Sequence, residues 1–240
     1  MTIQFVGGNF ASGTATSFTV SLQALYSGID TGAKPGDLVV AMTAYAAGTG
    51  AATLGVSGVA GAEYTNVYAI NQVETVDAAL SVRYKYLTAA DATCLVYGAA
   101  GGRVGIVSVW RGVNSVTPFI AAQSGAQVGV NNPLPIFSGV TPTIPGSVVL
   151  AVGCGSSAPL TNQFTMGANY TRAAGAQAAI TSTTSGIVGA IGYRYWPGYA
   201  AETPPAWTGP TDHGTNEGFV ATTLVLNPSP NKSIFTTSNT

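Results

Sequence analysis

The sequence predicts an all-β protein, an antiparallel β-sandwich of the jelly-roll or immunoglobulin-like type. Short apolar stretches with alternating residues recur along the whole chain, and Gly, Pro, Asn and Ser separate them. Helical periodicity is almost absent. Related motifs also occur in both halves of the chain, which indicates that the sandwich is built from two internal repeats of about 100 residues.

The expected strands are rich in β-branched and aromatic residues, which suit a pleated surface. In the first of them Phe18, Val20 and Leu22 share one face. The sequence TAADAT at residues 88–93 favours a helical turn. The segments predicted as strands are 17–22, 37–45, 64–72, 80–87 and 104–110.

An internal repeat relates the two halves. Residues 35–41 (PGDLVVA) match residues 145–151 (PGSVVLA), and in both a Pro-Gly turn leads into an apolar strand. Three further pairs match in the same chain order, at separations between 109 and 113 residues. These pairs are Phe18 and Val20 with Val128 and Val130, residues 82–86 with 190–196, and residues 105–114 with 218–227.

The repeat suggests a division of the chain into four parts. An N-terminal segment (1–15) precedes a first β-sandwich repeat (16–115), a second repeat (116–227) and a polar C-terminal tail (228–240). The motifs fit either two tandem sandwiches or one sandwich with a half from each repeat, and the short joining stretch favours closely packed halves. We expect the tail to be a peripheral arm that orders on a neighbouring molecule.

Charged residues are unusually few. Eight Lys and Arg with nine Asp and Glu make 7% of the chain, against roughly 25% in an ordinary soluble protein, and the net charge is −1. The mean hydropathy is +0.32. Because such a surface repels its neighbours weakly, we expect an assembly component that forms a homo-oligomer, a trimer or a pentamer.

The same composition excludes several partners. With a pI near 5.7 and no Lys/Arg cluster, we expect no nucleic-acid binding. The apolar runs are strand-sized, far short of the roughly 20 residues that span a membrane, and the first residues lack the regions of a signal peptide. We expect cytoplasmic synthesis, with Cys94 and Cys154 as small buried thiols without a disulfide framework.

No residue pattern supports a metal site or a hydrolase. The single histidine, His213, lies in a loop with Asp212 and Glu217, but the spacing is not that of metal ligands. A Ser hydrolase would need a nucleophile motif such as G-x-S-x-G, which the chain lacks. We therefore predict no catalytic residue and no metal.

Two further patterns are weak. Gly153 and Gly155 belong to a G-x-G-x-x-A pattern, but Pro159 follows at once, where a dinucleotide-binding helix would have to begin. Scattered acids always permit some glycosidase-type pair, so they carry little information. Those acids are Glu63, Glu74, Asp77 and Asp91. We predict that the chain is not an enzyme and holds no cofactor.

Residues 193–207 are rich in aromatic side chains and proline. Aromatic rings stack on sugars, but packing in a core or an interface explains them as well. The candidate glycan or interface residues are Tyr193, Tyr195, Trp196, Tyr199 and Trp207.

Residues 107–114 (VSVWRGVN) end a strand with Trp-Arg-Gly-Val. Together with PGDLVVA about 70 residues earlier and the second GSVVLA unit, this segment resembles a group of small β-rich structural proteins of tailed bacteriophages. The resemblance spans residues 35–151. It implies structural roles for Trp110, for Arg111, which would anchor the strand end, and for Gly112, which permits the turn.

The resemblance implies a capsid decoration, head-spike or tail-associated component. We expect a non-enzymatic structural protein of a tailed-phage virion, most of all a decoration or spike on the capsid surface. Its partners would be copies of itself and other virion proteins such as the major capsid protein. The alternative is an adhesion or carbohydrate-binding module at a tail fibre or tail tip, with a host surface glycan as its ligand. A hydrolase acting through His213 is a third hypothesis.

Overall fold

The computed structural model describes residues 2–15, 17–47, 55–57, 64–72, 77–89, 92–97, 102–124, 135–157, 164–174, 178–180, 186–198, 200–208 and 218–230. Within these ranges there is no helix, and the strands pair antiparallel. The prediction of an all-β antiparallel sandwich is therefore confirmed.

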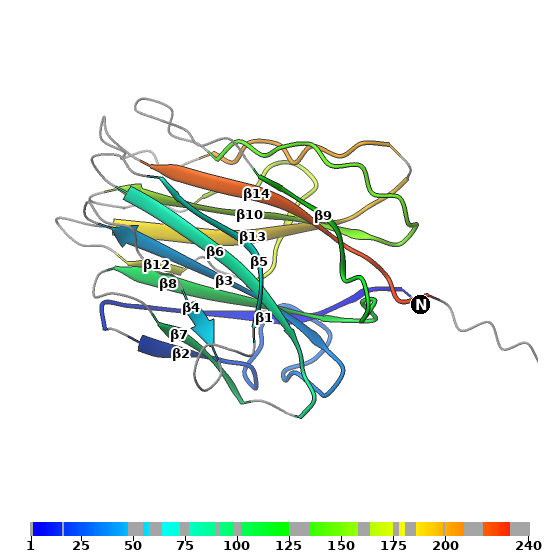
Figure 1. Cartoon of the computed structure of the whole chain (residues 1–240), viewed down its shortest axis with the longest axis horizontal. Helices are drawn as coiled ribbons and strands as arrows, with labels where there is room; N and C mark the ends of the chain where they lie inside the picture. The colour runs from blue at the N-terminus through cyan, green and yellow to red at the C-terminus, as the bar shows by residue number, and fades with distance from the viewer. Residues whose placement is uncertain are drawn as a thin grey trace, which may run out of the picture.

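Two large sheets and one small sheet make up the fold (Figure 1). The first sheet contains β1 (Gln4–Gly13), β3 (Leu38–Ala47), β5 (Thr65–Gln72), β6 (Asp77–Tyr86) and β8 (Arg103–Arg111), in the order β1-β8-β3-β6-β5. The second sheet contains β9 (Phe119–Ser124), β10 (Val148–Ser157), β11 (Thr171–Arg172), β12 (Ala178–Ile180), β13 (Gly186–Tyr195) and β14 (Phe219–Leu226). Its order is β11-β13-β10-β14-β9, and β12 also pairs with β13. The small sheet contains β2 (Ser17–Ser21), β4 (Gly55–Ser57) and β7 (Thr93–Tyr97), in the order β2-β7-β4.

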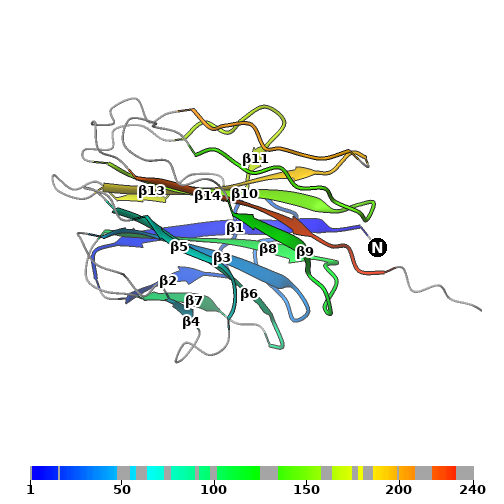
Figure 2. The ribbon, with the colours of Figure 1, turned by 45° about the horizontal axis from the view of Figure 1, so that its top comes forward.

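The sheets stack in layers (Figure 2). The first and second sheets face each other across the main core. The small sheet packs on the outer face of the first sheet, and coil segments within residues 137–207 cover the outer face of the second. Strands buried on both faces read as continuous apolar runs instead of alternating ones. This explains runs such as those of β8 and β14, in which consecutive residues are buried.

The main core joins the two halves of the chain. Apolar side chains from the first sheet meet those of the second in one cluster. Its members include Leu38, Val40, Met42, Val148, Leu150 and Val152. Of the two arrangements open from the sequence, the chain thus adopts one sandwich to which each half contributes a large sheet.

The two Pro-Gly motifs form equivalent turns. Gly36 and Gly146 have φ of 88° and 84°, in the left-handed region that glycine reaches without steric cost. The N–H of Asp37 donates to Lys34 O at 3.1 Å, and the N–H of Ser147 donates to Ile144 O at 3.2 Å. A proline followed by a positive-φ glycine and closed by this bond is a type II turn. Each turn starts the central strand of its sheet, β3 or β10.

The two large sheets share one topology. In both, the strand after the Pro-Gly turn lies at the centre, and Leu38 pairs with Tyr86 as Val148 pairs with Tyr195. On the other side of the central strand, Leu38 pairs with Trp110 and Val148 pairs with Leu226. The two partners, Trp110 and Leu226, are 116 residues apart in the sequence. The predicted match of 105–114 with 218–227 is therefore displaced by three residues. Shared topology agrees with a duplication without proving one, so the internal repeat stays a prediction.

Several boundaries differ from those expected. Residues 4–13 form β1, an edge strand of the first sheet, whereas the sequence predicts a separate N-terminal segment at residues 1–15. The predicted helical turn at 88–93 is not a helix where it is described, because residues 88–89 are bends and Thr93 starts β7. Residues 90–91 of that segment, and residues 231–240 of the tail, lie outside the described residues.

Candidate assembly surface

Arg111 ties the end of β8 to the turn that begins β3. Its Nε donates to Asp37 Oδ1 at 2.8 Å and its NH2 group donates to Oδ2 at 2.9 Å, a bidentate pair. The N–H of Lys34 donates to the same carboxylate at 2.9 Å. Because Asp37 is 1% exposed, these donors replace the water that a buried carboxylate would otherwise need. The hydrogen bond to Asp37 raises the pKa of Arg111, so the guanidinium stays charged.

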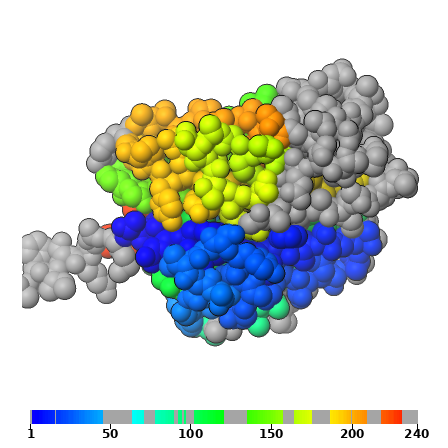
Figure 3. All heavy atoms as spheres, turned by 180° about the vertical axis from the view of Figure 1, so that it is seen from behind, coloured from blue at the N-terminus to red at the C-terminus, as the bar shows by residue number. Residues whose placement is uncertain are grey.

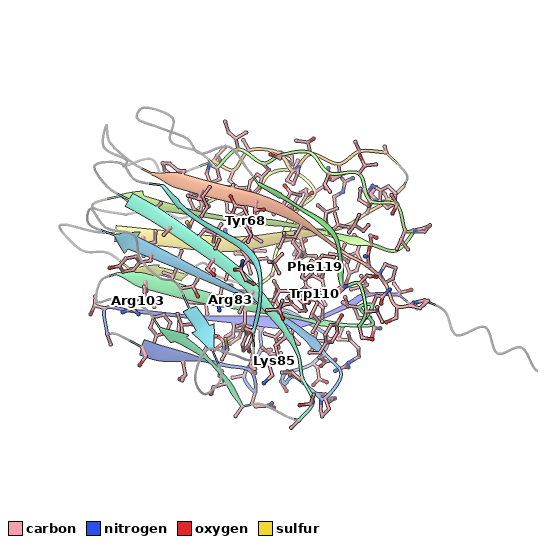
Figure 4. The ribbon with its side chains drawn as sticks, in the orientation of Figure 1. Tyr68, Arg83, Lys85, Arg103, Trp110 and Phe119 are labelled. Carbon is pink, nitrogen blue, oxygen red and sulfur yellow. The ribbon has the colours of Figure 1, made fainter. Side chains whose placement is uncertain are left out.

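Trp110 and Gly112 flank this anchor. Trp110 is completely buried in the main core, and its Nε1 donates to Ser108 Oγ at 2.9 Å. Figure 4 places it toward the end of the sandwich opposite to the one where Arg103 starts β8. Gly112 has φ of 81°, and a Cβ there would lie 2.8 Å from Thr2 O. Only glycine therefore lets the chain turn beside the N-terminal residues.

The candidate glycan residues mostly lie inside the protein. The Tyr193 ring packs 4.8 Å from Phe5 and 5.2 Å from Trp110, measured between centroids. Trp196 is buried and donates from Nε1 to Ala200 O at 3.0 Å. Trp207 is fully buried beneath the coil layer.

Tyr195 is the exception among the described aromatic candidates. It is 46% exposed, and its hydroxyl accepts a hydrogen bond from the Phe5 N–H at 3.1 Å. Tyr199 lies outside the described residues. A stacking platform that uses both tryptophans would require the outer layer to open, because protein atoms already cover their faces.

The weak chemical patterns have structural explanations where the chain is described. A Cβ on Gly153 would approach the Trp207 ring to 3.0 Å, and one on Gly155 would approach the Phe219 ring to 2.4 Å. Both glycines lie within β10, which continues to Ser157 and leads into no helix within the described residues. The G-x-G pattern thus makes room for aromatic rings.

No candidate metal site forms among the described residues. They include no group of three or more His, Cys, Asp and Glu side chains that could hold a metal. Cys94 and Cys154 are free and buried, and burial raises the pKa of each thiol to about 12, which makes them poor nucleophiles at neutral pH. Six of the candidate residues named from the sequence lie outside the described ranges: His213, Asp212, Glu217, Glu63, Glu74 and Asp91.

The described surface has little exposed charge. Lys34 is the one exposed side chain among the charged groups that the structure describes, and it forms an ion pair with Asp30. Arg194 and Glu202 pair with each other at 2.8 Å and are largely covered. The other charged side chains described are half-buried or buried: Arg83, Lys85, Arg103, Arg111, Arg172 and Asp37.

Of the six large apolar side chains that are exposed among the described residues, three lie at one end of the sandwich. Val116 in the β8–β9 loop is 85% exposed, and Ile144 in the second Pro-Gly turn is 37% exposed. Hydrogen bonds join this loop and turn to the ends of β13 and β14, because Asn114 N–H donates to Asn227 O and Trp196 N–H donates to Ser147 O. Tyr195 completes the group, which we call the apolar end.

Residues 22–33 cover the edge of β1 on the side seen in Figure 3, with Ile29 59% exposed.

A hollow of about 470 Å³ opens at the apolar end. It is lined by Thr2, by Asn114, by the Pro-Gly turn at residues 144–146 and by residues 228–230. None of these residues is charged. Sequence reasoning missed this hollow because its parts come from four distant segments.

Comparisons with known proteins add no assignment. No family model matches the chain, and no curated protein or solved structure matches it significantly. The described part of the chain contains no helix that could span a membrane.

Proposed function

We propose that the chain is a non-enzymatic structural subunit of a tailed-phage virion, a decoration or spike on the capsid surface. The observation that carries this proposal is the scarcity of exposed charge on the described surface. Charged side chains keep proteins apart in solution, and a surface without them favours association. The virion assignment itself rests on the resemblance at residues 107–114 and 35–41.

The apolar end supports the assembly role. Val116, Ile144 and Tyr195 are exposed at this end of the sandwich, beside an uncharged hollow. Exposed apolar side chains next to a hollow without charged groups suit contact with another protein. The proposed partners are copies of the chain, as a trimer or a pentamer, and the major capsid protein.

The carbohydrate-binding alternative has less support. Trp196 and Trp207 are buried in the hydrophobic cluster of the outer layer, so replacing either by Ala would lower the unfolding free energy by about 3–5 kcal/mol. A loss of glycan binding by such a variant could then result from unfolding. Tyr195→Ala is the informative variant for a glycan array, because Tyr195 is exposed.

Density-gradient purification of particles from the phage that encodes the chain tests the proposal. We expect the chain to co-purify with intact particles at a constant ratio to the major capsid protein. Mild dissociation should release it before the shell opens, as expected for an outer component. A chain that remains in the soluble fraction and never reaches the particles would contradict the virion assignment.

A further inference from the structure

The hollow at the apolar end has the size and chemistry of a site for an apolar side chain. Its volume of about 470 Å³ exceeds the roughly 150 Å³ that suffice for a benzene-sized group. Ile144, Pro145, Pro228 and Pro230 supply apolar surface, and the remaining lining residues with side chains, Thr2, Asn114 and Ser229, are polar but uncharged. Such a site fits an uncharged peptide segment that carries apolar side chains.

The chain is fixed in place up to the rim of this hollow. Asn227 N–H donates to Pro118 O and its Nδ2 donates to Thr117 O, both at 2.8 Å. Ser229 N–H donates to Gly112 O at 2.8 Å, and Ser229 Oγ donates to Val113 O at 2.8 Å. Figure 1 shows the described part of the chain leaving β14 and ending close to the N-terminus. Residues 231 onward therefore start from a defined point at the apolar end.

The segment that follows has matching composition. Residues 231–240 read NKSIFTTSNT, with an apolar pair, Ile234 and Phe235, among Ser, Thr and Asn, and with Lys232 as the one charge. Phe235 is five residues beyond Pro230, so an extended chain carries it up to about 17 Å away. That reach is enough to enter a neighbouring copy packed against the apolar end.

We propose that residues 231–240 of one copy bind the hollow of a second copy, with Ile234 and Phe235 seated between the Pro-Gly turn and Pro228. This inference rests on the proposed function, because it requires copies of the chain to associate. A neighbour is favoured over the same copy because Pro228 and Pro230 fix φ and keep the chain extended. Return into its own hollow would need a reversal within residues 231–233. Arms passed from copy to copy can close a ring.

Disulfide trapping tests this contact. Two single variants, Ile144→Cys and Phe235→Cys, are co-expressed as otherwise full chains, and the mixture is oxidised mildly. The native thiols Cys94 and Cys154 are buried and should not compete. We expect a disulfide-linked pair of one chain of each type, identified by peptide mass spectrometry and lost on reduction.

The control is Val116→Cys with Phe235→Cys. Val116 is 85% exposed at the same end but does not line the hollow. We expect at least about tenfold less cross-linking from this pair, because a seated arm holds its partner at a millimolar effective concentration. Equal yields from the two pairs would overturn the proposal.

A double variant that carries both Ile144→Cys and Phe235→Cys in one chain tests whether the arm in the hollow belongs to the same copy or to a neighbour. A cross-link within one chain, together with no mixed dimer from the single variants, would show that the arm fills its own hollow and would overturn the exchange. Absence of any 144–235 cross-link would likewise overturn it. If the unaltered chain still forms an oligomer in that case, the proposed function survives, whereas a monomer removes both.

Discussion

At the scale of single residues, Asp37 and Arg111 form a bidentate ion pair with a buried carboxylate. The guanidinium is partly exposed while the carboxylate is buried, so Arg111→Ala would leave Asp37 short of two donors in a dry site. We expect this variant to lose about 2–4 kcal/mol of unfolding free energy. Chemical denaturation followed by tryptophan fluorescence measures the loss.

The matched control for that variant is Lys34→Ala. It removes the Lys34–Asp30 ion pair, whose lysine is 60% exposed, and should cost less than about 1 kcal/mol. Arg111→Lys should fall between the two, because it keeps the charge but loses the planar pair of donors. Equal costs for Arg111→Ala and Lys34→Ala would be inconsistent with the anchoring role of the buried pair.

The two thiols give a pH prediction at the same scale. Burial raises the pKa of Cys94 and Cys154 from 9.0 to about 12. Folding therefore favours the neutral thiols, and this contribution is fully present below pH 9. It declines as the pH rises toward about 12, because the unfolded thiols ionise first. At pH 8 we expect no reaction of the native protein with an aromatic disulfide reagent and reaction of both thiols after denaturation; rapid labelling of either native thiol would contradict the described packing.

At the scale of elements, the two Pro-Gly turns should respond alike to mutation. A Cβ on Gly36 or Gly146 would meet no atom within 4 Å, so the cost of Gly→Ala comes from the positive φ alone. We expect each substitution to cost about 1–2 kcal/mol, and Gly→Asn to cost less, because Asn tolerates this region better. Gly198→Ala is the control, since a Cβ there also meets no atom and its φ lies outside that region. Thermal unfolding checks the ranking, and a Gly198→Ala loss as large as the others would refute it.

Some elements were predictable and others were not. Residues 37–45 and 104–110 alternate or run apolar between clear turn signals, and both appear as central strands. β1 was missed because Gly7 and Gly8 look like a turn in sequence. In the structure the register of β1 shifts between Phe5 and Gly7, and a Cβ on Gly8 would lie 2.1 Å from Ala173 O. Glycine at position 8 lets the backbone of β1 lie close to the backbone at Ala173. This contact is with a segment 165 residues away, so local sequence does not reveal it.

The candidate site was less predictable than the strands. Asp37 and Arg111 both occurred in the predicted motifs, but their pairing required the register that places β3 beside β8. Trp207 is buried by coil segments, and the alternation of apolar residues, which predicts strands, does not predict the path of coil. The hollow likewise depends on where chain ends and turns meet.

At the scale of the whole molecule, the low charge content has a sharper form than composition implies. The arginines lie half-buried or buried, so few charged side chains are exposed on the described part of the surface. This follows from the long side chain of Arg, which covers apolar surface and pairs with carboxylates or carbonyls. For example, Arg194 donates a hydrogen bond to Glu202 Oε1, and Arg172 donates one to Phe164 O. The resulting surface has little electrostatic repulsion to oppose contact between copies.

Sedimentation velocity of the purified full chain over a wide concentration range tests whether copies of the chain associate. We expect one closed species whose mass is a small integer multiple of 24.1 kDa and which persists on dilution. Its stability should change little with salt, because the described surface has little exposed charge. A well-behaved 24.1 kDa monomer at every concentration would contradict the claim that neighbouring copies cover this surface.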